Sequence, residues 1–169
     1  MPNREAPAYE FEALGGSNNV YAFVSINDVG YEVRFKPSGY LLPDPVLSDY
    51  VYEMVIDLVY NPFTPELPPV DERISTTIAL IVHDFFQVRE RGMIYICDDS
   101  DSRAYARKRL FDRWYNQHIK VGARFTRYEF PIEIDDDGTV YFAALICRLD
   151  NPYQVEMYMA FRRLALGEK

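Results

Sequence analysis

The stretch from Met93 to Gln117, MIYICDDSDSRAYARKRLFDRWYNQ, most constrains what this chain can fold into. Its first five residues are apolar and indicate a short buried strand, and an acidic Ser/Asp turn over 98–102 follows at once. The remaining residues place apolar side chains at helical spacing and carry five of the chain's eighteen basic residues. A buried strand that passes directly into a helix predicts a sheet with helices packed against it.

The charges of this helix do not fall evenly around it. At about 100° per residue, one side carries Arg103, Ala106, Arg107, Leu110, Trp114 and Gln117. We therefore expect the two arginines of this set to face inward, while Lys108 and Arg109 point elsewhere. Arg103 also lies in the first helical turn, where the helix macrodipole opposes a cation. It therefore needs an anion nearby.

That anion has two possible sources. Acidic side chains of the preceding turn would form structural ion pairs with the arginines, which is the more common arrangement. Alternatively, an acidic ligand would bind at the helix start, where free backbone N–H groups favour negative charge. The candidate ligand-binding residues are Asp98, Asp101, Ser102, Arg103 and Arg107.

Length and composition limit the remaining possibilities. A chain of 169 residues fits a single domain over 1–169, with a flexible N-terminus over 1–8 and a proline-rich connection over 61–70 that should be stiff and mostly extended. The apolar share of 49% argues against intrinsic disorder. The net charge of −8 disfavours nucleic-acid binding, because phosphate neutralisation dominates that affinity.

No segment indicates a membrane or an export signal. The N-terminus is polar, and no apolar run approaches the ~18 residues that a membrane span requires. Cys97 and Cys147 both lie in apolar strand patterns, so we expect small buried hydrophobes and not a disulfide framework. These features predict a soluble, cytosolic protein with no membrane partner.

The first half of the chain is rich in strand signals. Three strands over Tyr9–Ala13, Val20–Ile26 and Tyr31–Lys36 form a predicted antiparallel meander, because their connectors hold the Gly and Asn residues that tight hairpins need. A fourth strand over Tyr50–Tyr60 is interrupted only by two acidic residues. We therefore expect it to be buried on most of both faces.

The second half alternates helices and strands. Asp71 is a good N-cap for a helix that Gly92 ends, and Asn151 before Pro152 opens a last helix. A strand over Tyr128–Ile134 contains Pro131, which indicates a sheet edge or a bulge, and Thr139–Leu149 is its return strand. The predicted fold class is α+β, with a mixed, mostly antiparallel sheet of about seven strands and three helices.

No complete catalytic or metal-binding signature is present. Asp135 to Asp137 lack the ligand spacing of a calcium loop and indicate a solvated turn, so no metal is expected. His83 and His118 are isolated, without a nucleophile elbow, a phosphate-binding loop or zinc spacing beside them. Histidine-based acid/base catalysis is therefore unsupported.

The aromatic content points to a binding surface. Fourteen tyrosines exceed what a domain of this size can bury with every hydroxyl satisfied, so some should face a groove or a partner. Exposed aromatic residues anchor protein interfaces. The candidates for a partner surface are Tyr50, Tyr52 and Tyr60.

Two resemblances follow from these segments. The helix entry PPVDERI, the unit IYICDDSDSRAYARKRLFDRWY and the closing LDNP resemble a family of small bacterial proteins of unknown function, common in Bacteroidetes. From Val20 on, the predicted order of strands and helices is similar to the core of GCN5-related N-acetyltransferases. That family binds acyl-CoA pyrophosphate at a glycine-rich helix entry, for which Val70–Ser75, VDERIS, offers no glycine.

Two functional hypotheses remain. The first is a non-enzymatic interaction or regulatory module that needs no cofactor and meets a protein partner or a second copy of itself. The alternative is a divergent acyltransferase-like enzyme, or a small-anion binder of the acetyl-CoA or nucleotide type, that uses Arg103 and Arg107 beside Asp98 and Asp101.

Overall fold

The computed structural model describes residues 7–97, 104–120, 124–133 and 140–167. These residues form an α+β fold with seven strands and three helices, as predicted. In chain order the elements are β1 Glu12–Gly15, β2 Val20–Val24, β3 Gly30–Pro37, β4 Val51–Tyr60, α1 Glu72–Phe85, β5 Gly92–Cys97, α2 Ala104–Trp114, β6 Phe125–Glu133, β7 Val140–Arg148 and α3 Gln154–Ala165. A 3₁₀ turn over Leu47–Asp49 precedes β4, and a π-helical turn over Tyr115–Ile119 extends α2.

The strands follow one another in the order β1-β2-β3-β4-β5-β7-β6. β4 and β5 run parallel, whereas β1–β2, β2–β3, β5–β7 and β6–β7 pair antiparallel. The predicted meander and the predicted edge position of the strand with Pro131 are both confirmed. β7 lies between β5 and β6, as expected of an apolar return strand.

The chain divides into two compact units that share β4. Unit 1 comprises residues up to Lys36 together with 54–87, and unit 2 comprises 37–53 together with 88–169. The first three residues of β4 therefore belong to unit 2 and the last seven to unit 1. The prediction of a single domain stays a prediction, and each unit is described by itself.

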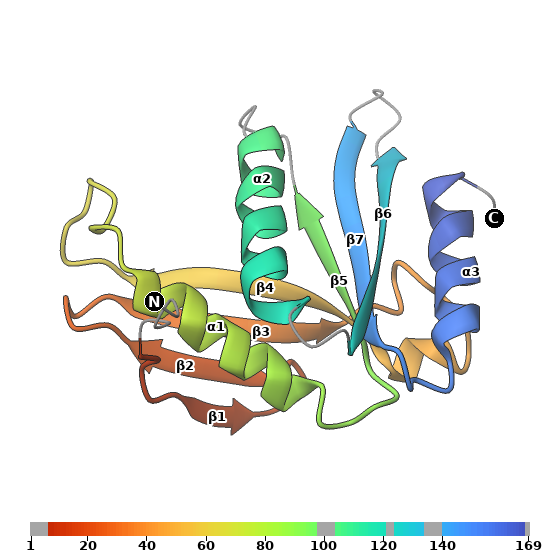
Figure 1. The fold of residues 1–169 in the computed structure, drawn as a ribbon, viewed down its shortest axis with the longest axis horizontal. Helices are drawn as coiled ribbons and strands as arrows, with labels where there is room; N and C mark the ends of the chain where they lie inside the picture. Colours follow the sequence, from red (N-terminus) through yellow and green to blue (C-terminus); the bar gives the residue numbers. More distant parts are fainter. Residues whose placement is uncertain (1–6, 98–103, 121–123, 134–139, 168–169) are drawn as a thin grey trace, which may run out of the picture. The chain divides into compact units, whose positions relative to one another are not determined.

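In unit 1, α1 packs across β2 and β3 (Figure 1). The rings of Phe35 and Phe85 stack with centroids 3.9 Å apart, and the Tyr21 hydroxyl donates to Asp84 Oδ2 at 2.7 Å. Asp71 is the N-cap of α1, as predicted, and its carboxylate accepts a hydrogen bond from the Arg73 N–H at 2.9 Å. Both phenylalanines are fully buried, so this helix closes the core of unit 1.

Two predictions about α1 and its surroundings were wrong. The first strand does not begin at Tyr9, because this residue binds the helix instead: its N–H donates to Thr77 Oγ1 at 2.8 Å and its hydroxyl donates to Asp71 Oδ2. The helix ends at Phe85 and not at Gly92, since the chain turns over 86–91. The two contacts of Tyr9 cannot be predicted from local sequence, because Thr77 and Asp71 lie more than 60 residues away in the chain.

The proline-rich connection also differs from its prediction. Residues 62–65 form a turn and not an extended segment. Asn61 organises it, because its Oδ1 accepts from the Phe63 N–H at 2.9 Å and its Nδ2 donates to Glu66 O at 2.7 Å. An asparagine side chain that mimics a backbone turn overrides the extended preference of the neighbouring prolines.

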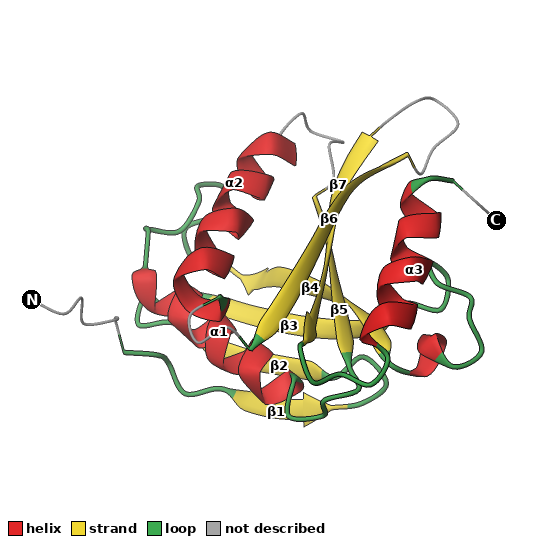
Figure 2. Ribbon diagram, turned by 45° about the vertical axis from the view of Figure 1, so that its right-hand side comes forward, coloured by secondary structure: helices red, strands yellow, loops and turns green. Residues whose placement is uncertain are grey.

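In unit 2, α2 and α3 cover opposite faces of the strands β5, β7 and β6 (Figure 2). On one face the ring of Tyr95 stacks on Phe111 of α2 with centroids 4.0 Å apart. On the other face Tyr128 and Phe130 of β6 pack against Tyr158 and Phe161 of α3. Successive residues of β6 therefore face different helices, as the strand period requires.

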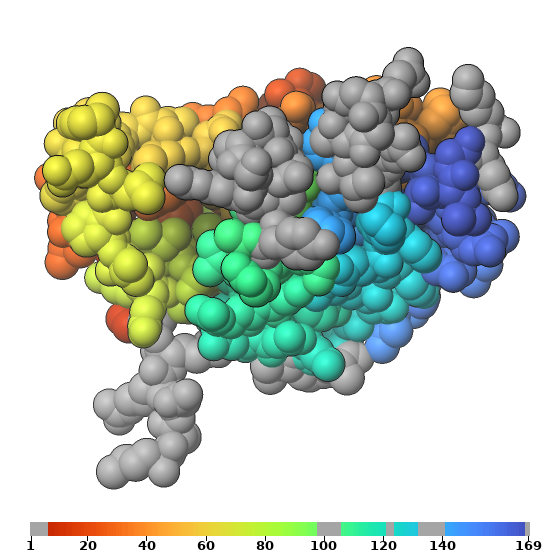
Figure 3. Space-filling model, turned by 90° about the horizontal axis from the view of Figure 1, so that it is seen from above, coloured from red at the N-terminus to blue at the C-terminus, as the bar shows by residue number. Residues whose placement is uncertain are grey.

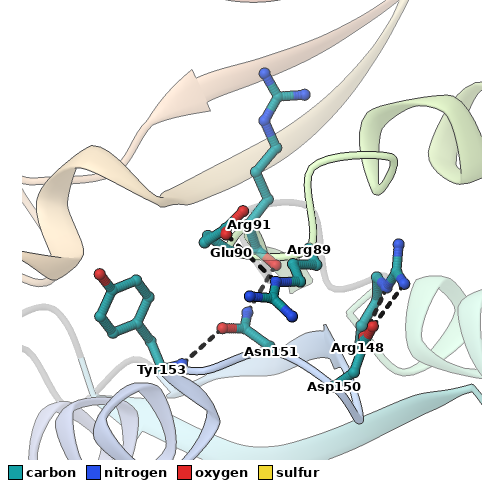
Figure 4. A network of polar contacts seen from close by, with 7 residues as sticks. All are labelled: Arg89, Glu90, Arg91, Arg148, Asp150, Asn151 and Tyr153. Atoms are coloured by element: carbon teal, nitrogen blue, oxygen red, sulfur yellow. Dashed lines mark hydrogen bonds and ion pairs between the residues drawn. The ribbon is translucent and has the colours of Figure 1, made fainter.

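The start of α3 is tied to the residues before β5 (Figure 4). Asn151 Nδ2 donates to Arg91 O at 3.1 Å, and Asn151 Oδ1 accepts from the Tyr153 N–H at 2.8 Å. Asn151 thus fixes the turn before the helix, and α3 itself begins later than predicted, at Gln154. Gly92 permits this close approach, since a methyl group there would lie 2.7 Å from Met157 Sδ.

Candidate functional site

The predicted ligand-binding residues are only partly described. Asp98, Asp101, Ser102 and Arg103 lie outside the described residues, as does the Asp135–Asp137 turn. Arg107 is half-buried on α2, and its charge acts on the Tyr95 hydroxyl and the Cys97 thiol. An anion site at the start of α2 therefore stays a prediction.

The predicted inward face of α2 was wrong. Leu110 is 62% exposed, and Ala106 and Gln117 are exposed as well. The buried residues are Phe111 and Tyr115, with Ile119 beyond them in the π-helical turn. α2 directs Phe111 to the sheet because the Tyr95 ring of β5 and the Arg127 guanidinium of β6 pack against the Phe111 ring.

This orientation of α2 brings four charged side chains together between α2 and β6. Lys108 Nζ lies 3.0 Å from Asp112 Oδ2 and 2.8 Å from Glu129 Oε1. Arg127 pairs with both carboxylates too, and its NH2 lies 3.0 Å from Glu129 Oε2. Two cations thus alternate with two anions in a closed ring, which we call the charge cluster.

Sequence reasoning missed the charge cluster, although one signal for it exists. Lys108 and Asp112 have the (i, i+4) spacing of a helical ion pair. Arg127 and Glu129 have the period of two that places both on one face of a strand. Nothing in the sequence shows that these two faces meet, because this depends on how α2 packs.

Arg127 is the most buried member of the charge cluster. Its side chain is 14% exposed, and its guanidinium carbon lies 5.3 Å from the Phe111 ring centroid and 5.2 Å from that of Tyr115. Aromatic faces at this distance attract a cation. The two carboxylates and two rings therefore hold the guanidinium between helix and sheet.

A cavity beside the charge cluster is too small for a substrate. Its volume is about 10 Å³, enough for roughly one water molecule. Cys97 lines it, and burial raises the pKa of this thiol to about 11, so it is not a reactive thiolate at neutral pH. Cys97 and Cys147 are free and buried, as predicted. The charge cluster is therefore a structural feature, a clamp whose ion pairs hold α2 against β6.

The second half of β4 is a different kind of site, because it is the last strand of unit 1. Unit 1, taken by itself, contains β1, β2, most of β3 and residues 54–60 of β4, in this order across the sheet. β3 therefore flanks one side of residues 54–60, and no described strand of unit 1 flanks the other. We call this other side, over 54–60, the open edge.

The direction of the backbone groups along β4 follows from two hydrogen bonds. The Ser38 N–H, at the end of β3, donates to Val51 O at 3.1 Å, and the Gly92 N–H, at the start of β5, donates to Tyr50 O at 2.8 Å. Successive residues of a strand direct their N–H and C=O groups to opposite sides. Ile56 and Leu58 therefore present their backbone groups to the open edge.

The open edge is also apolar and exposed. Exposure along β4 rises from 0% at Val51 and 3% at Met54 to 42% at Leu58 and 61% at Tyr60. The prediction that this strand is buried on most of both faces was therefore wrong for its second half. Apolar composition indicated burial, but burial also requires that other segments cover the strand.

The other two edges of the sheet carry features that discourage further pairing. β1 is four residues long and its register is interrupted between Ala13 and Gly15. β6 carries Arg127, Glu129 and Pro131 along its length. Short strands, bulges, charges and prolines are the usual protection of sheet edges. The sequence MVIDLVY over 54–60 has a single charge, Asp57, and no proline.

The three tyrosines predicted for a partner surface lie in different settings. Tyr50 is half-buried and stacks on Tyr153 with centroids 5.1 Å apart. Tyr52 is half-buried, and its hydroxyl donates to Asp49 O at 3.1 Å. Tyr60 lies at the end of the open edge with most of its side chain exposed. Of the three, Tyr60 is the one that is ready for a partner.

The start of α1 was the place at which the acetyltransferase resemblance implied a phosphate. The Asp71 carboxylate occupies this position, where it accepts from the Arg73 N–H and from the Tyr9 hydroxyl. The Arg73 guanidinium stacks over the Tyr9 ring, 3.9 Å from its centroid. A phosphate would meet a carboxylate here, so the arrangement does not favour an anion at this helix start.

A family described as being of unknown function (DUF6169) matches residues 70–163. The chain belongs to this family. The matched region runs from the residue before Asp71 into α3, so it includes the charge cluster and excludes the open edge. No curated protein and no solved structure matches the chain.

Two further features are absent from the described part of the chain. None of its helices combines the length and the apolar character of a membrane span. It also contains no group of three or more histidine, cysteine or acidic side chains arranged to hold a metal ion.

Proposed function

We propose that this protein is an interaction module that binds a protein partner through the apolar residues 54–60 of β4 and the loop that follows them. The observation that carries the proposal is the exposure of large apolar side chains here, which reaches 39% at Ile56, 42% at Leu58 and 61% at Tyr60. Exposed apolar side chains that lie next to one another are typical of interaction sites.

Side chains support the same assignment. Arg34 of β3 pairs with Asp57, which places Asp57 on the face opposite Val33 and Phe35. By alternation, Ile56, Leu58 and Tyr60 then lie on the face that α1 covers, with 39%, 42% and 61% of each side chain exposed. A partner that packs here would bury this partly exposed apolar face.

A space-filling view agrees with an accessible surface at this place. The end of β4 and the loop after it, coloured yellow in Figure 3, lie open in that view. In the loop, Phe63 is 38% exposed and Leu67 is 81% exposed. Large exposed apolar side chains that gather beside a strand edge are typical of interaction sites.

Site-specific cross-linking in cells tests the proposal. A photoreactive amino acid at Tyr60 should yield an adduct with a partner, whereas the same amino acid at Leu80 should not. Leu80 is a matched control because it is exposed, at 46%, but lies on α1. The partner would then be purified, and deuterium exchange at Ile56 and Leu58 should slow when it binds. Equal adducts at both positions, or unchanged exchange, would refute the proposal.

A second candidate function, acyl-CoA or small-anion binding, has one supporting observation. Arg107 is a half-buried cation on α2, and a guanidinium is the kind of group that pairs with a phosphate. Acetyl-CoA at 100 times its Kd would add roughly 2.7 kcal/mol of stability. A melting temperature that does not rise with acetyl-CoA would remove this candidate, and a rise lost in Arg107→Ala would favour it over the interaction module.

A further inference from the structure

The proline-rich connection between β4 and α1 has an extended part after its turn. Pro68 and Pro69 each fix φ at about −65°, and each restricts the residue before it to extended backbone. These constraints favour a polyproline II conformation over 67–69. The structure agrees, because residues 67–71 form neither helix nor strand, and Asp71 is extended with φ −141° and ψ 108°.

The exposure of side chains along this part repeats every three residues, which is the period of a polyproline II helix. Pro68 and Asp71 are half-buried, whereas the two residues between them are exposed. Leu67 and Val70 share another side of the helix, where 81% and 99% of each side chain is exposed. Residues 67–70, which we call the proline ridge, therefore turn their largest apolar side chains to solvent.

The proline ridge is held at both ends. Before it, Asn61 Nδ2 donates to Glu66 O at 2.7 Å. After it, the Asp71 carboxylate accepts from the Arg73 N–H at 2.9 Å and from the Tyr9 hydroxyl. All of these residues belong to unit 1. Because the segment is already ordered in an extended conformation, it loses little conformational entropy when a partner binds it.

We infer that the proline ridge is the ligand of a partner protein that binds polyproline II segments in a groove lined by aromatic side chains. The inference rests on the proposed function and adds the kind of partner. Such grooves recognise the preformed helix of a proline-rich chain together with the side chains that it displays. Glu66 is exposed at the start of the proline ridge, so a lysine or arginine at the rim of the groove would pair with it.

Cross-linking in cells identifies the partner and the place at which it binds. A photoreactive amino acid at Leu67 or at Val70 of the full-length chain should form an adduct with the same protein as one at Tyr60. Leu14 is the matched control and should form none, because it is 58% exposed but lies on β1. Mass spectrometry of the adducts should place the joined residue of the partner beside aromatic side chains.

Affinities of the purified partner for full-length variants then test how it recognises the chain. Pro69→Gly keeps Leu67 and Val70 but frees the backbone, so it should weaken binding about fivefold. Leu67→Ser should weaken binding about tenfold, and Leu14→Ser should leave it unchanged. Glu66→Gln should weaken it about twofold at low salt and not at 1 M salt. All four replaced side chains are exposed, so the melting temperature should stay at the wild-type value.

The outcomes separate this inference from the proposed function. If Tyr60 forms its adduct but Pro69→Gly and Leu67→Ser bind like the wild type, the inference is overturned and the proposed function stands. A loss in Leu67→Ser without a loss in Pro69→Gly would show recognition of apolar surface alone, which also overturns the inference. An adduct with a second copy of this chain would have the same consequence. If neither Tyr60 nor Leu67 forms an adduct, both proposals are overturned.

Discussion

The two halves of β4 have nearly the same composition and opposite surroundings. Val51 pairs with β5 and lies in the core of unit 2, where it is fully buried. Residues 54–60 are as apolar, but within unit 1 they form the last strand, and exposure along them rises from 3% at Met54 to 61% at Tyr60. The comparison shows that an apolar sequence favours burial but does not show whether other segments of the same chain cover it.

Proline substitutions should break the comparison most strongly. At Val55 a proline removes an N–H that is directed towards β3, and its ring meets that strand, so we expect a loss of about 3 kcal/mol or more. At Ile56 the lost N–H is directed to the open edge, and the loss should be clearly smaller. Urea denaturation of both variants measures the difference. Equal losses would mean that the open edge is engaged within the chain itself.

Truncation of side chains along the same face should show the same gradient. Met54 is 3% exposed, so Met54→Ala should cost about 2 to 4 kcal/mol through lost burial and a cavity. Leu58 is 42% exposed, so Leu58→Ala should cost less than about 1 kcal/mol. The midpoints of thermal unfolding report both changes. A cost for Leu58→Ala that equals that of Met54→Ala would show that this residue is covered in solution.

The charge cluster offers a contrast with ion pairs elsewhere in unit 2. Arg127→Met leaves Asp112 and Glu129 to share one cation, and we expect a loss of about 2 to 3 kcal/mol, because the pair is largely buried. Arg148→Met is the matched control, since the Arg148–Asp150 pair is more exposed, and it should cost about 1 kcal/mol or less. Guanidinium denaturation of both variants measures these values. Similar losses would show that the charge cluster is no clamp.

Acid should weaken the clamp by a small amount. Burial alone would raise the pKa of Asp112, but hydrogen bonds from Arg127 and Lys108 outweigh it and lower that pKa below the usual 3.8. A carboxyl whose pKa is lower in the folded than in the unfolded state stabilises the fold at a pH above its unfolded-state pKa. This stabilisation is lost as the pH falls through its folded-state pKa. The stability gap between the wild type and Asp112→Asn, about 1 kcal/mol or less, should therefore close below pH 3.8. A gap that widens in acid would contradict this assignment.

Sequence predicted the elements that depend on local chemistry. The glycine- and asparagine-rich connectors fixed the meander of β1, β2 and β3, and Pro131 marked β6 as an edge. The helical period located α2, but it chose a face that includes Leu110 in place of the one with Phe111. The buried face of α2 depends on the Tyr95 ring of β5 and the Arg127 guanidinium of β6. Both lie too far from Phe111 in the sequence for a helical pattern to reveal them.

The candidate sites show the same division. The acidic turn and Arg103 were predicted to form a site because of their position at the start of α2, and they lie outside the described residues. The open edge was missed because the apolar composition of β4 indicated burial on both faces, whereas its second half is exposed. Tyr60 was named for its aromatic ring, and its exposure keeps it a candidate for a partner surface.

The core of unit 2 includes Leu42, Leu47 and Val51, which come from a segment far upstream of the rest. The family match begins at residue 70 and omits all three. A recombinant fragment cut to the matched limits would lack these side chains and leave apolar surface uncovered on Leu145 and Met157, which share the same cluster. Expression trials on this family should therefore keep residues 37–53 in the cloned fragment.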